Sequence, residues 1–371
     1  MHNIEIKKVN GVEVASFAEN GRRERAWHGL GEGQQIFDRP MFVEEALKAC
    51  HADYEVSMQP VVALSQELVD AMENGKFINA SMLRDLLVDK TMATIRTDTN
   101  KSLGITSDSY GIVQNIDAFK FIDMLCSGLD SNRKEKPTIE TCGVLGHGER
   151  VFITCKMPED IILNPRTDDK IETYVVFTTS HDGTGAVKCM VTNVRVVCQN
   201  SLNWALQHNS GRIAFRHSSK VMSRLDLLNK ENAEFAYKTL GLWQEYETAF
   251  KESLEHLRHI KLTEKDIDNI IAEVTLADDA KKIFLETRNI NHEDIATRGR
   301  NIFLGMKECL ENGIGQDILD KGNALWAING ITSFFQNEAK FKNNEVKFDN
   351  IMNSGVYKKV QKAYDMMLLA A

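Results

Sequence analysis

Short extended segments that alternate with turn sequences dominate the first half of the chain, and they constrain its fold more than any other feature. Hairpins are predicted over residues 91–106, 138–157 and 172–197. Two of their turns, Gly146-His147-Gly148-Glu149 and Asp182-Gly183-Thr184-Gly185, contain the glycines that tight hairpin turns favour. Strands joined in this way, with few helices between them, favour an antiparallel sheet over a Rossmann fold.

The second half of the chain has a helical pattern instead. Between residues 221 and 260, apolar residues recur at steps of three and four, which predicts one long amphipathic helix. Thr263 and Asp266 resemble a capping box that starts a second helix, and Asn291 is predicted to cap a third. Further helices are predicted over residues 322–336 and 356–369.

The fold class that follows is α+β, in two parts. We expect a mixed domain with an antiparallel, hairpin-rich sheet over residues 1–220 and a mainly helical domain over residues 221–371. Two short helices are also expected in the first part, at residues 41–50 and from Asn115, as N-cap, to about Cys126. An extended segment over residues 54–64 contains Pro60, which predicts an edge strand or a bulge.

Composition excludes several classes of protein. The 371 residues carry 45 Lys and Arg against 53 Asp and Glu, a net charge of -8, and no apolar run is long enough to span a membrane. The seven cysteines have no CxxC spacing, so we expect reduced thiols, no zinc ribbon and a cytoplasmic location. Neither a P-loop nor an HExxH motif occurs, and the sequence predicts no metal and no cofactor.

One window of this acidic chain contains no acidic residue at all. It runs from Gly183 to Leu225 and suits a polyanion, because each neutralised phosphate releases a counterion. Aromatic residues in the same window are candidates for stacking on bases. The predicted nucleic-acid contacts are Lys188, Arg195, Trp204, Arg212, Phe215, Arg216 and Lys220. The alternative is a basic sheet edge that pairs with acidic helices of the second half.

A second candidate site combines His181 and Asp182 with Cys198 and Asn200. A Cys, a His and an Asn can form a nucleophilic set, and Cys198 lies where a predicted strand meets a predicted helix. The same residues have structural interpretations: the glycine-rich segment after His181 as a hairpin turn, Cys198 as core and Asn200 as a helix N-cap. The sequence leaves both interpretations open.

Four motifs, in this order along the chain, resemble a known family. They are Ala26-Trp27-His28-Gly29-Leu30-Gly31, Ser180-His181-Asp182-Gly183-Thr184-Gly185-Ala186-Val187, Arg195-Val196-Val197-Cys198-Gln199-Asn200-Ser201-Leu202 and Asn329-Gly330-Ile331-Thr332. Together they resemble the phage/plasmid-like proteins that carry domain of unknown function 932. The resemblance implies a bacteriophage, plasmid or prophage setting in bacteria; it implies no activity, and the role of the Trp27-His28-Gly29 motif stays open.

Two classes of function are therefore predicted. The first is an ATP-independent protein that binds single-stranded nucleic acid, with a role in annealing or recombination, more in keeping with a binding protein than an enzyme. The second is an enzyme or a host-factor-binding, anti-defence protein that uses the Cys198/His181 region. A homo-oligomer and a host protein remain candidate partners, and no membrane partner is expected.

Overall fold

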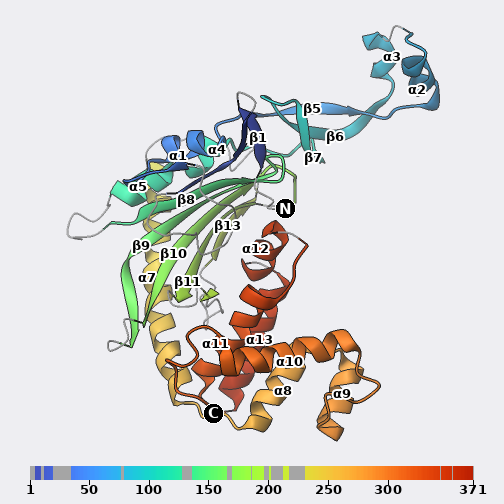
Figure 1. The fold of residues 1–371 in the computed structure, drawn as a ribbon. Coiled ribbons are helices and arrows are strands. Elements are labelled where there is room, and N and C mark those ends of the chain that lie inside the picture. The colour runs from blue at the N-terminus through green and yellow to red at the C-terminus, as the bar shows by residue number, and fades with distance from the viewer. Residues whose placement is uncertain are drawn as a thin grey trace.

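The fold is α+β, as the sequence predicts, with sheets in the N-terminal half and helices in the C-terminal half (Figure 1). The computed structural model describes residues 5–9, 12–19, 35–76, 79–127, 136–164, 169–184, 186–195, 200–201, 212–216, 230–342, 344–352 and 354–370. Within 200–201 and 212–216, the backbone alone is described.

The main sheet contains two of the three predicted hairpins, over residues 138–157 and 172–197, and is antiparallel except at one end. Its strand order is β12-β11-β10-β9-β8-β3-β4, and β13 pairs with β11 beside β12. The strands are β3 (Phe17–Glu19), β4 (Gln35–Ile36), β8 (Thr138–Leu145), β9 (Arg150–Asn164), β10 (Asp169–Ser180), β11 (Ala186–Arg195), β12 (Asn200–Ser201) and β13 (Arg212–Arg216). β3 and β4 form the parallel pair. β1 (Ile6–Val9) and β2 (Val12–Ala15) form a separate hairpin.

A three-stranded sheet extends from the main sheet as an arm (Figure 1). It contains β5 (Val56–Val62), β6 (Leu87–Arg96) and β7 (Lys101–Ser107), in that order. The predicted edge position of Pro60 is confirmed, because β5 pairs with β6 alone. Two short helices, α2 (Gln66–Glu73) and α3 (Ala80–Arg84), lie at the far end of the arm (Figure 1).

Short helices of the first half cover one face of the main sheet. They are α1 (Val43–Ala49), α4 (Asn115–Phe119) and α5 (Phe121–Ser127). The single helix predicted from Asn115 is wrong in two respects, because it divides at Lys120 and its N-cap is Gln114. Asn115 does not cap the helix because its side chain donates to Ala52 O at 2.9 Å and meets His181 Nε2 at 2.8 Å.

The helical half follows the predicted order with two corrections. Its helices are α7 (Lys230–His259), α8 (Glu264–Thr275), α9 (Asp278–Thr287), α10 (Thr297–Asn312), α11 (Ala324–Ser333), the π-helix η1 (Phe334–Glu338), α12 (Asn344–Met352) and α13 (Gly355–Leu369). The Thr263 capping box is confirmed. Asn291 is not an N-cap, because its N–H donates to the Asn289 side chain in a turn and α10 begins at Thr297. The sequence did not predict α9 or α12.

A single hydrophobic cluster runs through both halves. It includes Val175 and Phe177 of the main sheet, Phe250 of α7 and Ile328 of α11. The helical half therefore completes the core of the sheet half. The predicted boundary at residue 220 lies outside the described residues. Within the described chain, every helix is too short or too polar to span a lipid bilayer.

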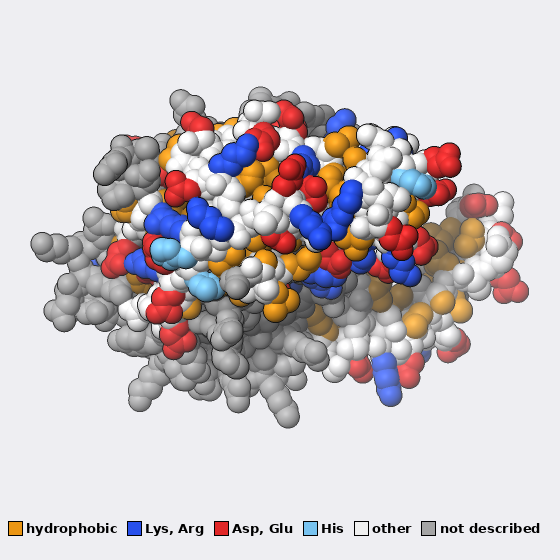
Figure 2. Space-filling model, turned by 90° about the horizontal axis from the view of Figure 1, so that it is seen from below, with side chains coloured by type: hydrophobic (Ala, Val, Ile, Leu, Met, Phe, Trp, Pro, Cys, Tyr) orange, Lys and Arg blue, Asp and Glu red, His pale blue; other side chains and the backbone are white. Residues whose placement is uncertain are grey.

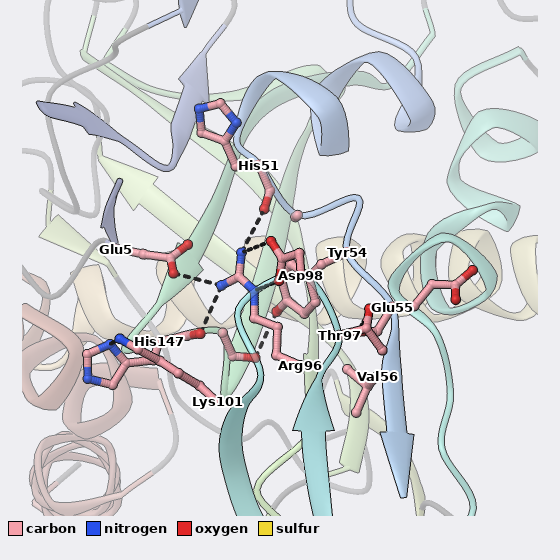
Figure 3. A network of polar contacts seen from close by, with 12 residues as sticks. Glu5, His51, Tyr54, Glu55, Val56, Arg96, Thr97, Asp98, Lys101 and His147 are labelled. Atoms are coloured by element: carbon pink, nitrogen blue, oxygen red, sulfur yellow. Dashed lines mark hydrogen bonds and ion pairs between the residues drawn. The ribbon is translucent and has the colours of Figure 1, made fainter. Parts of the chain in front are cut away.

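Arg96 joins the arm to the main sheet (Figure 3). Its guanidinium donates to the Glu5 carboxylate at 2.7 Å and to His147 O at 2.8 Å, and it stacks 3.8 Å from the centre of the Tyr54 ring. Asp98, at 2.7 Å from Arg96 Nε, completes the network. Because Arg96 is fully buried, these partners replace the water that an exposed guanidinium would bind.

Candidate functional site on one face of the main sheet

The two faces of the main sheet differ in what they carry. The helix-covered face bears Cys155, Val175 and Phe177, which belong to the large core cluster. The opposite face, named here the Tyr174 face, bears a smaller cluster that includes Phe152, Tyr174, Val176 and Met190. Alternation along each strand separates the two sets, since successive side chains point to opposite faces.

Three cationic residues occupy backbone positions on the Tyr174 face where β11 pairs with β13. In the register of this pair, Met190 lies opposite Arg212, Lys188 opposite Ala214, and Ala186 opposite Arg216. Residues that pair directly share a face, and residues two apart on one strand do as well. Lys188, Arg212 and Arg216, named here the basic edge, therefore occupy one face at neighbouring positions. Lys188 is partly exposed.

Phe215 belongs to the other face. It lies opposite Val187, and Ile213 lies opposite Cys189; both partners on β11 are part of the large core cluster. A nucleic-acid strand lying on the Tyr174 face would not meet a residue on the helix-covered face. Phe215 and the basic edge, which the sequence groups into one contact set, are thus separated by the sheet.

Arg195 is a core residue, and its predicted role as a phosphate contact is corrected here. Its side chain is 1 % exposed and its Nη2 lies 2.7 Å from Asp169 Oδ2, which is fully buried. The same Nη2 donates to Gly315 O at 2.9 Å. With its guanidinium engaged in this way, Arg195 ties β11 to β10 and to the helical half.

Of four other predicted site residues, three lie outside the described part of the chain and one is described by its backbone alone. Trp204, Lys220 and Cys198 lie outside the described residues, as does the Trp27-His28-Gly29 motif. Asn200 is described by its backbone, which pairs with Arg195 in β12. This strand pairing replaces the predicted helix N-cap at that position.

His181 and Asp182 serve separate structural roles. His181 is fully buried, with Nε2 2.8 Å from Asn115 Oδ1 and its carbonyl accepting from Thr94 Oγ1 at 2.6 Å. Asp182 faces its own turn, where Oδ1 accepts from Ser180 Oγ at 2.6 Å and from Thr184 N at 2.9 Å. Although burial opposes ionisation, these hydrogen bonds lower the pKa of Asp182.

The arm packs directly onto this turn, which favours its structural interpretation. A β-carbon on Gly104 would lie 2.5 Å from Asp182 Cα, so only glycine allows β7 to approach this closely. Gly183 has φ of +77°, a left-handed conformation that the turn requires. The His181–Asp182 pair is therefore a docking point between the two sheets, and the two side chains do not form a dyad.

A carboxylate cluster on the Tyr174 face was not predicted. The Tyr174 hydroxyl lies 3.1 Å from both Glu140 carboxylate oxygens and 2.9 Å from Glu172 Oε2, and both glutamates are 2 % exposed. One hydroxyl proton can serve only one carboxylate at a time. Burial, and then the charge of Glu140, raises the pKa of Glu19 nearby. The sequence signal that could have predicted this cluster is the presence of acidic residues at alternate positions of predicted strands, such as Glu172.

The raised pKa of Glu19 predicts a pH-dependent effect of the Glu19→Gln variant. A carboxyl with a folded-state pKa above its unfolded value of 4.5 contributes most to stability below pH 4.5, and that contribution is lost as pH rises through the folded pKa. Glu19→Gln should therefore increase the free energy of unfolding at pH 8, and this gain should shrink towards zero at pH 4. Urea unfolding of the variant and of the unmodified protein at pH 4 and pH 8 measures this difference in the free energy of unfolding.

Glu45→Gln provides a control of opposite sign. Hydrogen bonding to Arg39 and then to the Phe42 N–H lowers the pKa of Glu45 to about 2. The ionised Glu45 carboxylate therefore stabilises the folded protein. This stabilisation is complete above the ordinary glutamate pKa and is lost as pH falls towards 2. Glu45→Gln should thus reduce stability at pH 8 more than at pH 3. A Glu19→Gln effect that is equal at pH 4 and pH 8 contradicts the assignment.

Charge on the helical end of the molecule is mixed. Figure 2 shows Lys and Arg side chains interspersed with Asp and Glu over the face seen from below. Ion pairs there include Lys281 with Glu273 at 3.0 Å and Lys307 with Asp268 at 2.7 Å. Among the described residues, no group of His, Cys, Asp or Glu side chains is arranged to hold a metal ion.

Comparison with known proteins identifies a family but no characterised relative. No curated protein and no solved structure matches the chain. A family model, Domain of unknown function (DUF932), matches residues 102–354. The match covers more than half of the chain and contains the His181 motif, the Cys198 motif and Asn329-Gly330-Ile331-Thr332, with the Trp27 motif lying before it. The chain therefore belongs to the DUF932 family.

Proposed function

We propose that this DUF932 protein binds single-stranded nucleic acid along the basic edge. The observation that carries the proposal is the β11–β13 register, which gathers Lys188, Arg212 and Arg216 on one face of the sheet. Cations spaced along neighbouring strands suit the regularly spaced phosphates of a nucleic-acid backbone. Trp204 and Lys220, from the same acid-free window, remain predicted contacts; the proposal omits Arg195, which is buried, and Phe215, whose register position is on the other face.

The carboxylate cluster lies too far from the basic edge to oppose binding. On β10, Glu172 is six positions from Thr178, the partner of Lys188. At roughly 3.3 Å per residue, this separation is about 20 Å along the strand. The distance exceeds the screening length of about 8 Å at physiological ionic strength. Attraction of phosphate at the basic edge is thus compatible with buried carboxylates at the other end of the face.

The biological setting proposed is a cytoplasmic, ATP-independent role in replication or recombination of a phage or plasmid. It rests on the four motifs that resemble phage/plasmid-like proteins and on the missing P-loop sequence. Strand annealing would require the protein to present two nucleic-acid strands side by side. A homo-oligomer, in which several copies align their basic edges, is the arrangement that meets this requirement.

The variant Lys188→Ala/Arg212→Ala/Arg216→Ala tests the basic edge. We expect its affinity for single-stranded DNA at 0.1 M salt to fall at least about tenfold. The slope of log affinity against log salt should become shallower by about 2, since each phosphate contact on a single strand contributes about 0.7. Fluorescence anisotropy with a labelled oligonucleotide measures both quantities.

A charge-matched control variant distinguishes the effect of losing local phosphate contacts from the effect of lowering the positive charge of the whole protein. Lys76, Lys265 and Lys282 are exposed, and none of them has an ion-pair partner in the described part of the chain. Their triple alanine variant removes the same charge and should retain the affinity and salt slope of the unmodified protein. Equal losses in both triple variants contradict the proposal, as does unchanged binding in the basic-edge variant.

A further inference from the structure

A groove of about 830 Å³ lies in the helical half. It is formed by α10, η1, the segment after η1, α12 and the start of α13. Its volume falls within the range of ligand sites, about 300–1,000 Å³. Its lining includes Arg298, Phe335, Lys340, Phe341, Lys359 and Glu338.

Three cationic side chains line this groove. Within the described chain, neither a hydrogen bond nor an ion pair engages the side-chain nitrogens of Arg298, Lys340 or Lys359. Burial, and then the charge of Arg298, lowers the pKa of Lys359. Glu338 is the one acidic residue among the described lining residues. Cations held together without carboxylate partners form a site that an anion would stabilise.

Two helix N-termini add to the positive potential of the groove. Thr297 and Arg298 open α10, and Gly355 and Val356 open α13; all four residues line the groove. Neither helix receives a side-chain cap at its N-cap residue. A helix of this length carries partial positive charge at its N-terminus and presents free N–H groups there, which are a frequent site of phosphate binding.

Aromatic side chains form another wall of the groove. Phe334 and Phe335 lie in the π-helix η1, with ring centroids 5.7 Å apart at an interplanar angle of 71°. Lys359 Nζ lies 5.6 Å from the centroid of the Phe335 ring. Phe341 follows η1 and is partly buried. Single-turn π-helices often occur at functional sites, and this one sets a planar apolar surface beside the cations.

We infer that this groove binds a nucleoside phosphate. The phosphate lies against Arg298, Lys359 and the two helix N-termini, and the base lies against Phe335 and Phe341. Glu338 supplies an acceptor for the hydroxyl or amino groups of the nucleoside. The combination of anionic and planar recognition selects this ligand class over inorganic anions or apolar molecules. The site is separate from the basic edge and goes beyond the proposed nucleic-acid function.

Calorimetric titration of the full-length protein tests the inference. The probes are ATP, GTP, CTP, UTP, inorganic tripolyphosphate and adenosine, each at the same ionic strength. We expect at least one nucleotide to bind, and tripolyphosphate and adenosine each to bind at least about tenfold more weakly than that nucleotide. The reason is that each of them lacks one of the two recognised parts.

Variants locate the binding site. Arg298→Met/Lys359→Met should weaken nucleotide binding at least about tenfold, because both charged contacts with phosphate are removed. Phe341→Leu should weaken nucleotide binding and leave tripolyphosphate binding unchanged. Lys265→Met/Lys282→Met removes the same charge from exposed positions and should have no effect, and the basic-edge triple variant should also retain nucleotide binding.

Three results would overturn the inference. The first is no binding of any of the four nucleotides at millimolar concentration. The second is nucleotide binding that Arg298→Met/Lys359→Met leaves unchanged, which would locate the ligand elsewhere. The third is tripolyphosphate that binds as tightly as the nucleotides, which would reduce the groove to an anion site.

Discussion

Replacing Arg96 with methionine is expected to reduce the free energy of unfolding by about 3–5 kcal/mol. The guanidinium is fully buried, and the Glu5 side chain that it contacts at 2.7 Å is 9 % exposed. Its removal leaves a nearly buried carboxylate that still accepts a hydrogen bond from the Ser16 hydroxyl at 3.1 Å. The variant also loses the donor to His147 O, which holds the arm against the main sheet, and the ion pair with Asp98 within the arm itself (Figure 3).

Equilibrium urea unfolding of Arg96→Met measures this loss. Arg39→Met is the matched control, because Arg39 makes an equally short ion pair with Glu45, 2.7 Å, in which the side chains are 52 % and 37 % exposed. An exposed pair of this kind contributes little to stability, because water and salt screen the two charges. If the two variants lose similar stability, Arg96 does not hold the junction as described.

Arg195→Met is expected to cost about 3–5 kcal/mol of stability without changing the DNA affinity of the folded protein. The reason is that Asp169, with a fully buried side chain, is left without its 2.7 Å ion-pair partner. The contact from Arg195 to Gly315 O is lost as well, which loosens the connection between β11 and the helical half. The substituted side chain does not lie on the face that carries the basic edge.

A double substitution distinguishes the two possible roles of Arg195, which are a buried ion pair with Asp169 and a contact with phosphate. Arg195→Met/Asp169→Leu replaces a buried ion pair with apolar groups and should recover most of the stability lost in Arg195→Met. DNA affinity, corrected for the folded fraction, should match that of the unmodified protein in both variants. An Arg195→Met protein of unchanged stability and reduced DNA affinity would show that Arg195 contacts phosphate after all.

Local patterns predicted the strands and most helices, because their signals are contained in short stretches of sequence. Turn glycines and β-branched residues located β8 to β11, and the Thr263 capping box located α8. The division of the strands into separate sheets depends on contacts distant in sequence. The docking of Gly104 on Asp182, for example, has no local signal. Two helices, α9 and α12, were missed, and α12 lacks a marked apolar stripe.

The acid-free window from Gly183 to Leu225 could be found in the sequence. The sheet face on which each of its residues lies could be predicted only in part. Lys188 and Arg195 are seven positions apart on one strand, and an odd separation places them on opposite faces. The same rule separates Phe215 from Arg212 and Arg216. Strand alternation therefore contained this information. The pairing of β13 with β11, which brings Lys188 beside the two arginines, depends on tertiary register.

The most direct measurement is the binding of labelled single-stranded and double-stranded DNA to the unmodified protein across a salt series. The predicted stacking of Trp204 on unpaired bases favours the single strand, and three phosphate contacts predict a slope of log affinity against log salt of about -2 or steeper. No binding at low salt would contradict the proposed function. Binding of single-stranded DNA that does not change with salt would contradict it equally, because a basic edge that contacts phosphates must release counterions.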